Sequence, residues 1–150
     1  MYPIEIPRYS PKTKVVDGQT LIFDFVRKKY LVITPEELVR QGLINHLIND
    51  LYYPKSLISV EKEVKYGKKS NRSDIHIRYN NGGCFMVVEC KSFRENINQS
   101  TFDQAAKYST VLKADFLVVT NGSVTYCCKI DHEARRFDFI NSLPSYPKVN

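Results

Sequence analysis

The period of the hydrophobic and polar positions changes several times along the chain, and each change predicts a new element of secondary structure. Two short apolar runs, residues 21–26 and 30–33, flank the basic turn 27–29 and predict two strands. Further on, apolar and polar positions alternate over residues 58–65, which predicts a strand with one buried face. Residues 1–19 contain three prolines and few periodic hydrophobic positions, so we expect an irregular N-terminal arm.

A helix is predicted between these strands. Thr34 is a good N-cap, Pro35 suits the first helical position, and Glu37 completes a capping box. Apolar side chains then recur at the 3.6-residue spacing of a helix, to about residue 51. The members of this apolar face are Leu38, Val39, Leu43, Leu47 and Leu51.

The second half of the chain predicts another helix between further strands. A helix over about 101–113, opened by a box-like cap at Ser100, precedes a buried strand over residues 115–122 that ends in an Asn-Gly turn. Further strand candidates lie at residues 123–130 and 135–139. The order helix, three strands, helix, strand favours an α/β sandwich with a mixed sheet, in which the second helix returns the chain alongside the central strand.

The composition is typical of one soluble globular domain. The chain has 150 residues, of which 43% are hydrophobic and 25% are charged. We take residues 20–140 as the core of a single domain spanning 1–150, with residues 141–150 as a C-terminal tail. The start of the chain has no signal-peptide pattern, and no apolar run reaches about 18 residues, so we expect a cytoplasmic location and no membrane partner.

The net charge indicates the kind of partner that the chain would bind, and the cysteine content indicates its redox environment. The formal charge of +6 and the pI near 9.1 favour a polyanionic partner such as nucleic acid. The cysteines form no C-x-x-C pair, and all lie in expected strands, so we expect buried thiols in a reducing compartment rather than zinc ligands or disulfides. The cysteines are Cys84, Cys90, Cys127 and Cys128.

A predicted hairpin over residues 72–92 carries charges where a strand would bury hydrophobic side chains. If the Asn-Gly pair at 81–82 forms a two-residue type I′ turn, Asp74 lies directly opposite Glu89, with Cβ atoms about 4.5–5.5 Å apart. Lys91 shares the strand face of Glu89. A turn centred one residue later would pair Asp74 with Lys91, so a plain cross-strand ion pair stays open as the alternative.

The two carboxylates of this hairpin need a nearby cation, because they repel each other and lose hydration at the end of an apolar strand. Lys91 is one candidate, and a divalent metal ion is the other. Mg²⁺ commonly binds one or two carboxylates and completes its coordination with waters. A bound metal activates a water, and an adjacent ammonium stabilises charge on a phosphate oxygen, so the arrangement favours phosphodiester hydrolysis.

The spacing of Asp74, Glu89 and Lys91 resembles the D…(D/E)-x-K motif of the restriction-endonuclease-like, or PD-(D/E)XK, nucleases. Ser73 stands where that motif has proline. The resemblance implies that Asp74 and Glu89 are ligands of Mg²⁺ or Mn²⁺. It also implies that Lys91 orients the attacking water and stabilises the developing negative charge.

A second motif lies on the next predicted helix. Gln104 and Tyr108 resemble the Q-x-x-x-Y motif of the branch that includes helicase-linked nucleases. Side chains four residues apart share a helix face, so we expect both to reach the catalytic site. The alternative is a solvated Gln and a half-buried Tyr with no catalytic role.

A narrower resemblance covers roughly residues 25–125. Residues 34–41, 88–92 and 119–122, with the Gln…Tyr pair, resemble the N-terminal nuclease domain of type I restriction enzyme R subunits. This implies an αβββαβ core with a mixed sheet flanked by helices, Mg²⁺-dependent DNA cleavage as an endonuclease or an exonuclease, and DNA and other subunits of a restriction system as partners. The chain has no G-x-x-x-x-G-K-[ST] loop, so the ATP-driven translocation of R subunits is not carried over. A stand-alone relative, a piece of a larger assembly and a degenerate copy all stay open, as does the oligomeric state, a dimer included.

Other charged residues are candidates for the same site. Glu61, or Glu63 on the same strand face, is a further candidate metal ligand. Glu37 resembles the helix-borne acid of the family, although its capping box explains it without catalysis. Phosphate contacts that position a duplex, or else a solvated surface, are expected at a set of basic residues. These are Arg40, Lys65, Lys68, Lys69 and Arg72.

Two functions from different classes follow. A metal-dependent nuclease is the leading hypothesis, because Asp74, Glu89 and Lys91 are all present. The second is a catalytically inactive nucleic-acid-binding or assembly module with the same fold. A small-molecule enzyme that uses Lys91 as a nucleophile is a third, and no cofactor motif supports it.

Overall fold

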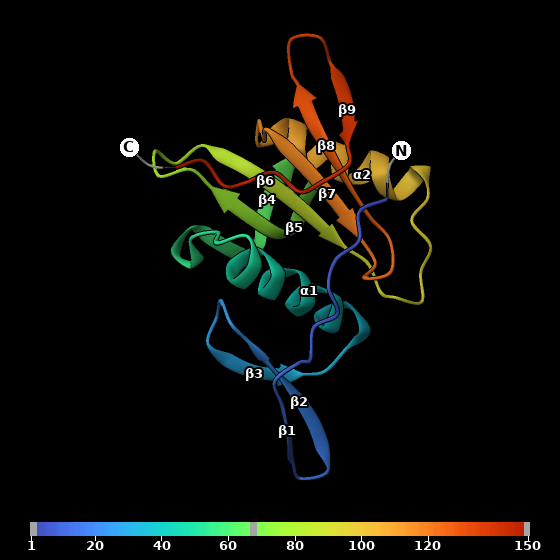
Figure 1. The fold of residues 1–150 in the computed structure, drawn as a ribbon. Coiled ribbons are helices and arrows are strands. Elements are labelled where there is room, and N and C mark those ends of the chain that lie inside the picture. Colours follow the sequence, from blue (N-terminus) through green and yellow to red (C-terminus); the bar gives the residue numbers. More distant parts are fainter. Residues whose placement is uncertain (1–2, 67–68, 149–150) are drawn as a thin grey trace.

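The computed structural model describes the backbone of residues 3–66 and 69–148, and the side chains within these ranges except those of residues 61–73. The strands and helices of this part of the chain form two sheets and two α-helices (Figure 1). They are β1 (Thr13–Val16), β2 (Gln19–Asp24), β3 (Lys29–Val32), α1 (Pro35–Asn45), β4 (Ile58–Tyr66), β5 (Lys69–Arg78), β6 (Cys84–Cys90), α2 (Gln99–Val111), β7 (Phe116–Thr120), β8 (Thr125–Asp131) and β9 (Arg136–Ile140).

The larger sheet has the strand order β4-β5-β6-β7-β8-β9. Only the β6–β7 pair is parallel among the described strand pairs, and α2 makes the crossover between these two strands. The order α1, β4, β5, β6, α2, β7 confirms the predicted αβββαβ core and its mixed sheet. The candidate strands at residues 123–130 and 135–139 are also confirmed, as β8 and β9.

The helices cover opposite faces of this sheet, because successive residues of a strand point to opposite sides. Val88 of β6 packs in a buried cluster with Leu43 of α1, whereas Val87 packs in a second cluster with Ala105 of α2. Figure 1 shows α1 between the six-stranded sheet and the three-stranded sheet β1-β2-β3. The α1 helix therefore joins the two sheets.

Both helices begin at side-chain caps. Thr34 Oγ1 accepts a hydrogen bond from the Glu37 backbone N–H at 3.1 Å, and the helical path continues as a π-helical turn over His46–Asp50, which confirms the predicted start and end. The second helix begins earlier in the chain than predicted, because α2 is capped by Asn98 rather than Ser100. Asn98 Oδ1 accepts from the Thr101 N–H at 2.9 Å, and Asn is as good an N-cap as Ser.

The segment predicted to be an irregular N-terminal arm contains β1. Val16 pairs with Gln19 across Asp17 and Gly18, whose φ angles of 51° and 76° are both positive. Two positive φ angles define a type I′ hairpin turn, for which Asp-Gly is a preferred sequence. The Asp-Gly pair was therefore the sequence signal for a hairpin that contains β1. This hairpin was missed because the prolines earlier in the segment indicated irregular structure.

The turn between β5 and β6 differs from the predicted type I′ turn at residues 81–82. Gly82 N–H donates to Tyr79 O at 3.0 Å, Tyr79 N–H donates to Gly83 O at 2.7 Å, and Gly82 has φ 94°. This pattern is typical of a longer connection that ends in a left-handed glycine. A bulge between Ile77 and Arg78 absorbs the extra residue, and the register beyond it, such as Ile75 with Val88, is the one predicted.

Two further sequence expectations can be compared with the structure. All four cysteines are buried as thiols, and burial raises the pKa of Cys127 to about 12. None of the helices in the described part of the chain has the length and apolar character needed to cross a bilayer.

Removal of the α1 cap should destabilise the domain. We expect Thr34→Ala to lower the free energy of unfolding by about 1 kcal/mol, because the Glu37 N–H loses its acceptor. Thr34→Ser keeps the hydroxyl and should stay close to wild type, and so should Thr110→Ala at an exposed position of α2. Urea denaturation followed by circular dichroism measures the difference, and an equal effect of all three changes would contradict the role of the cap.

Candidate functional site

Two acids meet where β5 and β6 run side by side. Ile75 pairs with Val88, so the next position along each strand brings Asp74 opposite Glu89. The two strands are also joined through a side chain, since Asp74 Oδ2 accepts a hydrogen bond from the Cys90 N–H at 2.8 Å. The opposition of carboxylates predicted from the sequence is present, although a different turn produces it.

Glu89 has an unusual environment for an acid. Its residue is only 9% exposed, its Oε1 lies 3.6 Å from Lys91 Nζ, and its buried Oε2 has no hydrogen-bond partner among the described residues. Burial, and then the charge of Asp74, raise the pKa of Glu89 to about 7, against the opposing effects of Lys91 and Arg40. Glu89 is therefore an acid whose negative charge is only partly compensated.

Arg40 of α1 is the second cation at this site. Its Nη2 donates to Asp74 Oδ1 at 3.0 Å, and its side chain is 5% exposed. Burial disfavours the charged guanidinium, but the carboxylates of Glu37 and Asp74 outweigh this effect and raise the pKa of Arg40. The predicted contact of Arg40 with DNA phosphate stays a prediction; in this structure the Arg40 side chain is buried in ion pairs with Glu37 and Asp74.

Glu37 was predicted to be a metal ligand, and the structure gives its carboxylate other partners. Its Oε1 accepts hydrogen bonds from Arg40 and, at 3.2 Å, from Arg27 Nη2. Its Oε2 lies 3.5 Å from Gln41 Nε2. In the described part of the chain no group of three or more His, Cys, Asp or Glu side chains is arranged to hold a metal ion, so Glu37 does not extend the Asp74–Glu89 pair into such a group.

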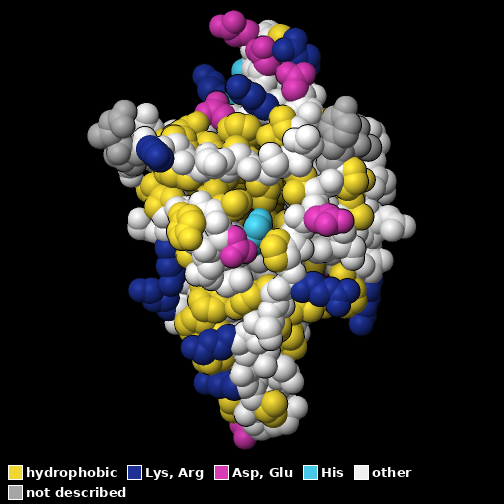
Figure 2. All heavy atoms as spheres, in the orientation of Figure 1, with side chains coloured by type: hydrophobic (Ala, Val, Ile, Leu, Met, Phe, Trp, Pro, Cys, Tyr) yellow, Lys and Arg dark blue, Asp and Glu magenta, His cyan; other side chains and the backbone are white. Residues whose placement is uncertain are grey.

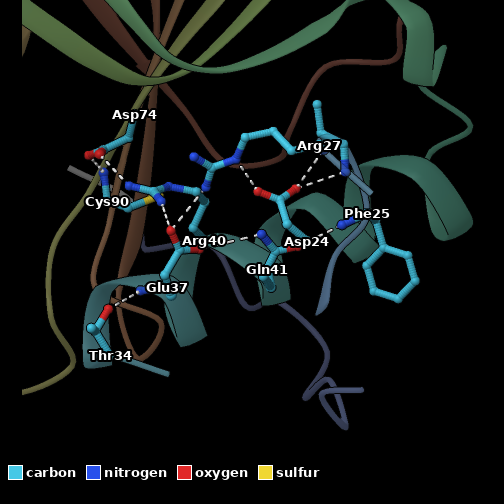
Figure 3. A network of polar contacts seen from close by, with 10 residues as sticks. Asp24, Phe25, Arg27, Thr34, Glu37, Arg40, Gln41, Asp74 and Cys90 are labelled. Carbon is cyan, nitrogen blue, oxygen red and sulfur yellow. Dashed lines mark hydrogen bonds and ion pairs between the residues drawn. The ribbon is translucent and has the colours of Figure 1, made fainter. Parts of the chain in front are cut away.

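These pairs form a line of alternating charge, which we call the ion chain: Asp24, Arg27, Glu37, Arg40 and Asp74 (Figure 3). It begins at the fully buried Asp24 in β2, whose carboxylate also accepts from the Val26 N–H at 2.9 Å. Burial alone would raise the pKa of Asp24, but hydrogen bonds from Arg27 and Val26 outweigh burial and lower it. The ion chain therefore links the three-stranded sheet, through α1, to the acid on β5.

Asp74 and Glu89 suit a hard divalent cation. Each oxygen of Asp74 accepts one hydrogen bond, which leaves a further lone pair on each, and Glu89 Oε2 has both lone pairs available within the described protein. Mg²⁺ bound through two carboxylates and waters needs no more protein ligands than these. The donor set thus fits Mg²⁺ or Mn²⁺ in chemical type.

The other predicted acids lie on β4. Val60 pairs with Ile75 and Lys62 pairs with Ser73, so the backbone position of Glu61 is the one opposite Asp74. The side chains of Glu61 and Glu63 lie outside the described residues, so their part in metal binding stays a prediction.

Four of the residues predicted to contact DNA lie on β4, on β5 or between these two strands. They are Lys65, Lys68, Lys69 and Arg72. Lys68 lies outside the described backbone, and the side chains of the other three lie outside the described residues. The predicted basic loop over 67–72 is shortened, since β5 already begins at Lys69.

Gln104 and Tyr108 share one face of α2, as their spacing predicted. Gln104 Nε2 donates to Tyr108 Oη at 3.1 Å, with Gln104 exposed and Tyr108 buried. No hydrogen bond in the described structure joins either side chain to Asp74 or Glu89. A catalytic role for this pair stays a prediction.

The fold and the site together define a class of protein. A mixed sheet between two helices, with Asp74, Glu89 and Lys91 around the meeting point of β5 and β6, is compatible with a restriction-endonuclease-like fold. The family described as type I restriction enzyme R protein N terminus matches residues 35–144, and the chain belongs to this family. No curated protein matches the chain.

The raised pKa of Glu89 predicts how stability depends on pH in metal-free buffer. The folded protein keeps the Glu89 proton up to about pH 7, whereas the unfolded chain loses it near 4.5. The contribution of the Glu89 proton to the free energy of unfolding is thus fully present below pH 4.5, and it is lost as the pH rises through about 7. Urea denaturation in EDTA at about pH 4.5 and about pH 8 should show wild type losing on the order of 3 kcal/mol more than Glu89→Gln, at about 1.4 kcal/mol per pKa unit. Equal losses in the two proteins would contradict this assignment.

Removal of the Arg40 guanidinium should be costly, because Asp74 and Glu37 would lose a buried counter-charge. We expect Arg40→Met to lower the free energy of unfolding by about 3 kcal/mol or more. Arg136→Met is the matched control, since Arg136 pairs with Asp138 at 2.8 Å but its side chain is 60% exposed. The control should cost much less, because exposed ion pairs contribute little to stability. Similar losses in both variants, measured by chemical denaturation at neutral pH, would show that the Arg40 pairs behave as surface pairs.

Proposed function

We propose that this domain hydrolyses DNA phosphodiester bonds with the help of Mg²⁺ or Mn²⁺ held by Asp74 and Glu89. The observation that carries the proposal is the buried, unpartnered Oε2 of Glu89 beside a second carboxylate and an ammonium group. A like-charged pair of acids is unfavourable in the apo protein and becomes favourable around a dication. Membership of the R-protein N-terminal family supports a nuclease-like domain with DNA as its partner.

Each side chain has a distinct part in the proposed reaction. The Arg40 guanidinium and the Cys90 N–H hold the two oxygens of Asp74 in place, so this carboxylate is oriented before metal binds. A bound divalent ion supplies Lewis-acid chemistry and lowers the pKa of a coordinated water. Lys91, whose side chain is 28% exposed beside Glu89, is placed to orient the attacking water and to stabilise negative charge on the phosphate.

A plasmid cleavage assay tests the proposal. Purified protein is incubated with supercoiled plasmid in Mg²⁺, in Mn²⁺ and in EDTA. We expect nicked or linear product only with a divalent ion, and no product from Asp74→Asn, Glu89→Ala or Lys91→Ala. Glu133→Gln, an exposed acid beyond β8, should cleave like wild type. Cleavage in EDTA, or undiminished cleavage by Glu89→Ala, would contradict the metal-dependent mechanism.

The same assay separates the second candidate, a nucleic-acid-binding or assembly module without catalysis. The ion pair between Arg40 and Asp74 favours it, since Asp74 already has a cationic partner without metal. Under this alternative the protein binds DNA with the same affinity in Mg²⁺ and in EDTA, and cleaves it in neither.

A further inference from the structure

The outward face of the three-stranded sheet carries lysines and aromatic rings together. Across the strands, Lys14 pairs with Leu21, and Phe23 pairs with Tyr30. Phe23 N–H also donates to Lys12 O at 2.8 Å, which places Lys12 beside this face. We call Lys12, Lys14, Phe23 and Tyr30 the lysine–aromatic face. The opposite face of β2 is buried.

Each lysine lies over one of the rings. Lys12 Nζ is 4.6 Å from the Phe23 ring centroid, and Lys14 Nζ is 4.1 Å from the Tyr30 ring centroid. The rings themselves pack edge to face with centroids 5.1 Å apart. Cation–π contacts of this kind hold a long side chain in place, which reduces the entropy lost when its ammonium group binds a partner.

The ammonium groups have no acidic partner in the described structure. Every described ion pair involves another cation, and both lysines are exposed. Their N–H donors are therefore available to an anion from solution. The aromatic rings are covered by the lysines, so the face suits phosphate groups better than stacked bases.

The segment that builds this sheet is basic. Residues 12–32 contain five Lys or Arg against two Asp, a net charge of +3 out of +6 for the whole chain. One of the two acids, Asp24, is fully buried and paired with Arg27. Figure 2 shows several Lys and Arg side chains along the lower part of the molecule, where the three-stranded sheet lies, with one acidic side chain at its tip; at the opposite end acidic and basic side chains lie together.

The position of this sheet is fixed relative to Asp74. Arg27, at the turn between β2 and β3, contacts Glu37, which contacts Arg40, which contacts Asp74. A polyanion held on the lysine–aromatic face would thus have a defined relation to the candidate catalytic acids.

We propose that the lysine–aromatic face binds the phosphate backbone of DNA and positions it for the site at Asp74 and Glu89. The proposal rests on the proposed function for its substrate, but DNA binding by this face does not depend on cleavage. Lys12 and Lys14 each contact one phosphate, so the binding is independent of base sequence. Exposed Lys28, in the turn between β2 and β3, adds a further positive charge to the same sheet.

Fluorescence anisotropy in EDTA tests the proposal without cleavage. A labelled DNA of about 20 base pairs, and its single strand, are titrated with the full chain over a range of salt concentrations. Lys12→Met with Lys14→Met keeps the aliphatic stems over the rings and removes both charges. We expect affinity to fall on the order of ten-fold at about 0.1 M salt, and the log–log salt slope to fall by about 1.8, at about 0.9 per lost phosphate contact.

Two controls make the result specific. Lys113→Met with Lys129→Met removes the same charge from exposed positions beyond α2 and on β8, and should leave the salt slope near wild type. Lys12→Arg with Lys14→Arg should restore binding. An unchanged slope for the Lys12 and Lys14 methionine variant, or an equal loss in the control pair, would overturn the proposal. DNA binding by wild type in the absence of any plasmid cleavage would instead count against the proposed hydrolysis alone, so the two failures are distinguishable.

Discussion

The guanidinium of Arg40, between Glu37 and Asp74, is the contact on which the arrangement of this protein depends. It joins the helix that lies between the two sheets to the acid at the edge of the β5–β6 pair. Because the group is buried, its charge is tolerated only while both carboxylates stay in place, and each carboxylate in turn depends on it. The ion pair therefore orients the helix, and it settles the position of Asp74 before any ligand arrives.

This arrangement makes the two acids unequal. Asp74 has a buried arginine and a backbone N–H as partners, whereas Glu89 has a partly exposed lysine at 3.6 Å and one oxygen with no described partner. Different environments of this kind separate the protonation behaviour of neighbouring carboxylates. Asp74 is the oriented, paired member of the pair, and Glu89 is the member that gains most from a new cation.

Most of the fold could be predicted from the sequence because its signals are local. The Thr-Pro-Glu-Glu start of α1, the alternation in β4 and the apolar strand that precedes Glu89 each depend on neighbours in the sequence, and each is present. The roles of Glu37 and Arg40 could not be found in this way. The capping pattern accounted for Glu37, and the partner of Arg40 lies 34 residues further along the chain. Only the packing of α1 against β5 shows that two charged residues on a helix face inward.

The connection between β5 and β6 shows that two different turns can give the same strand register. A two-residue turn without a bulge, and the longer connection with the bulge at Ile77 and Arg78, place Asp74 opposite Glu89 with the same number of residues between them. Neither turn needs an insertion or deletion relative to the other. The pairing of the two acids therefore depends on the register of β5 and β6, and not on which of the two turns closes the hairpin.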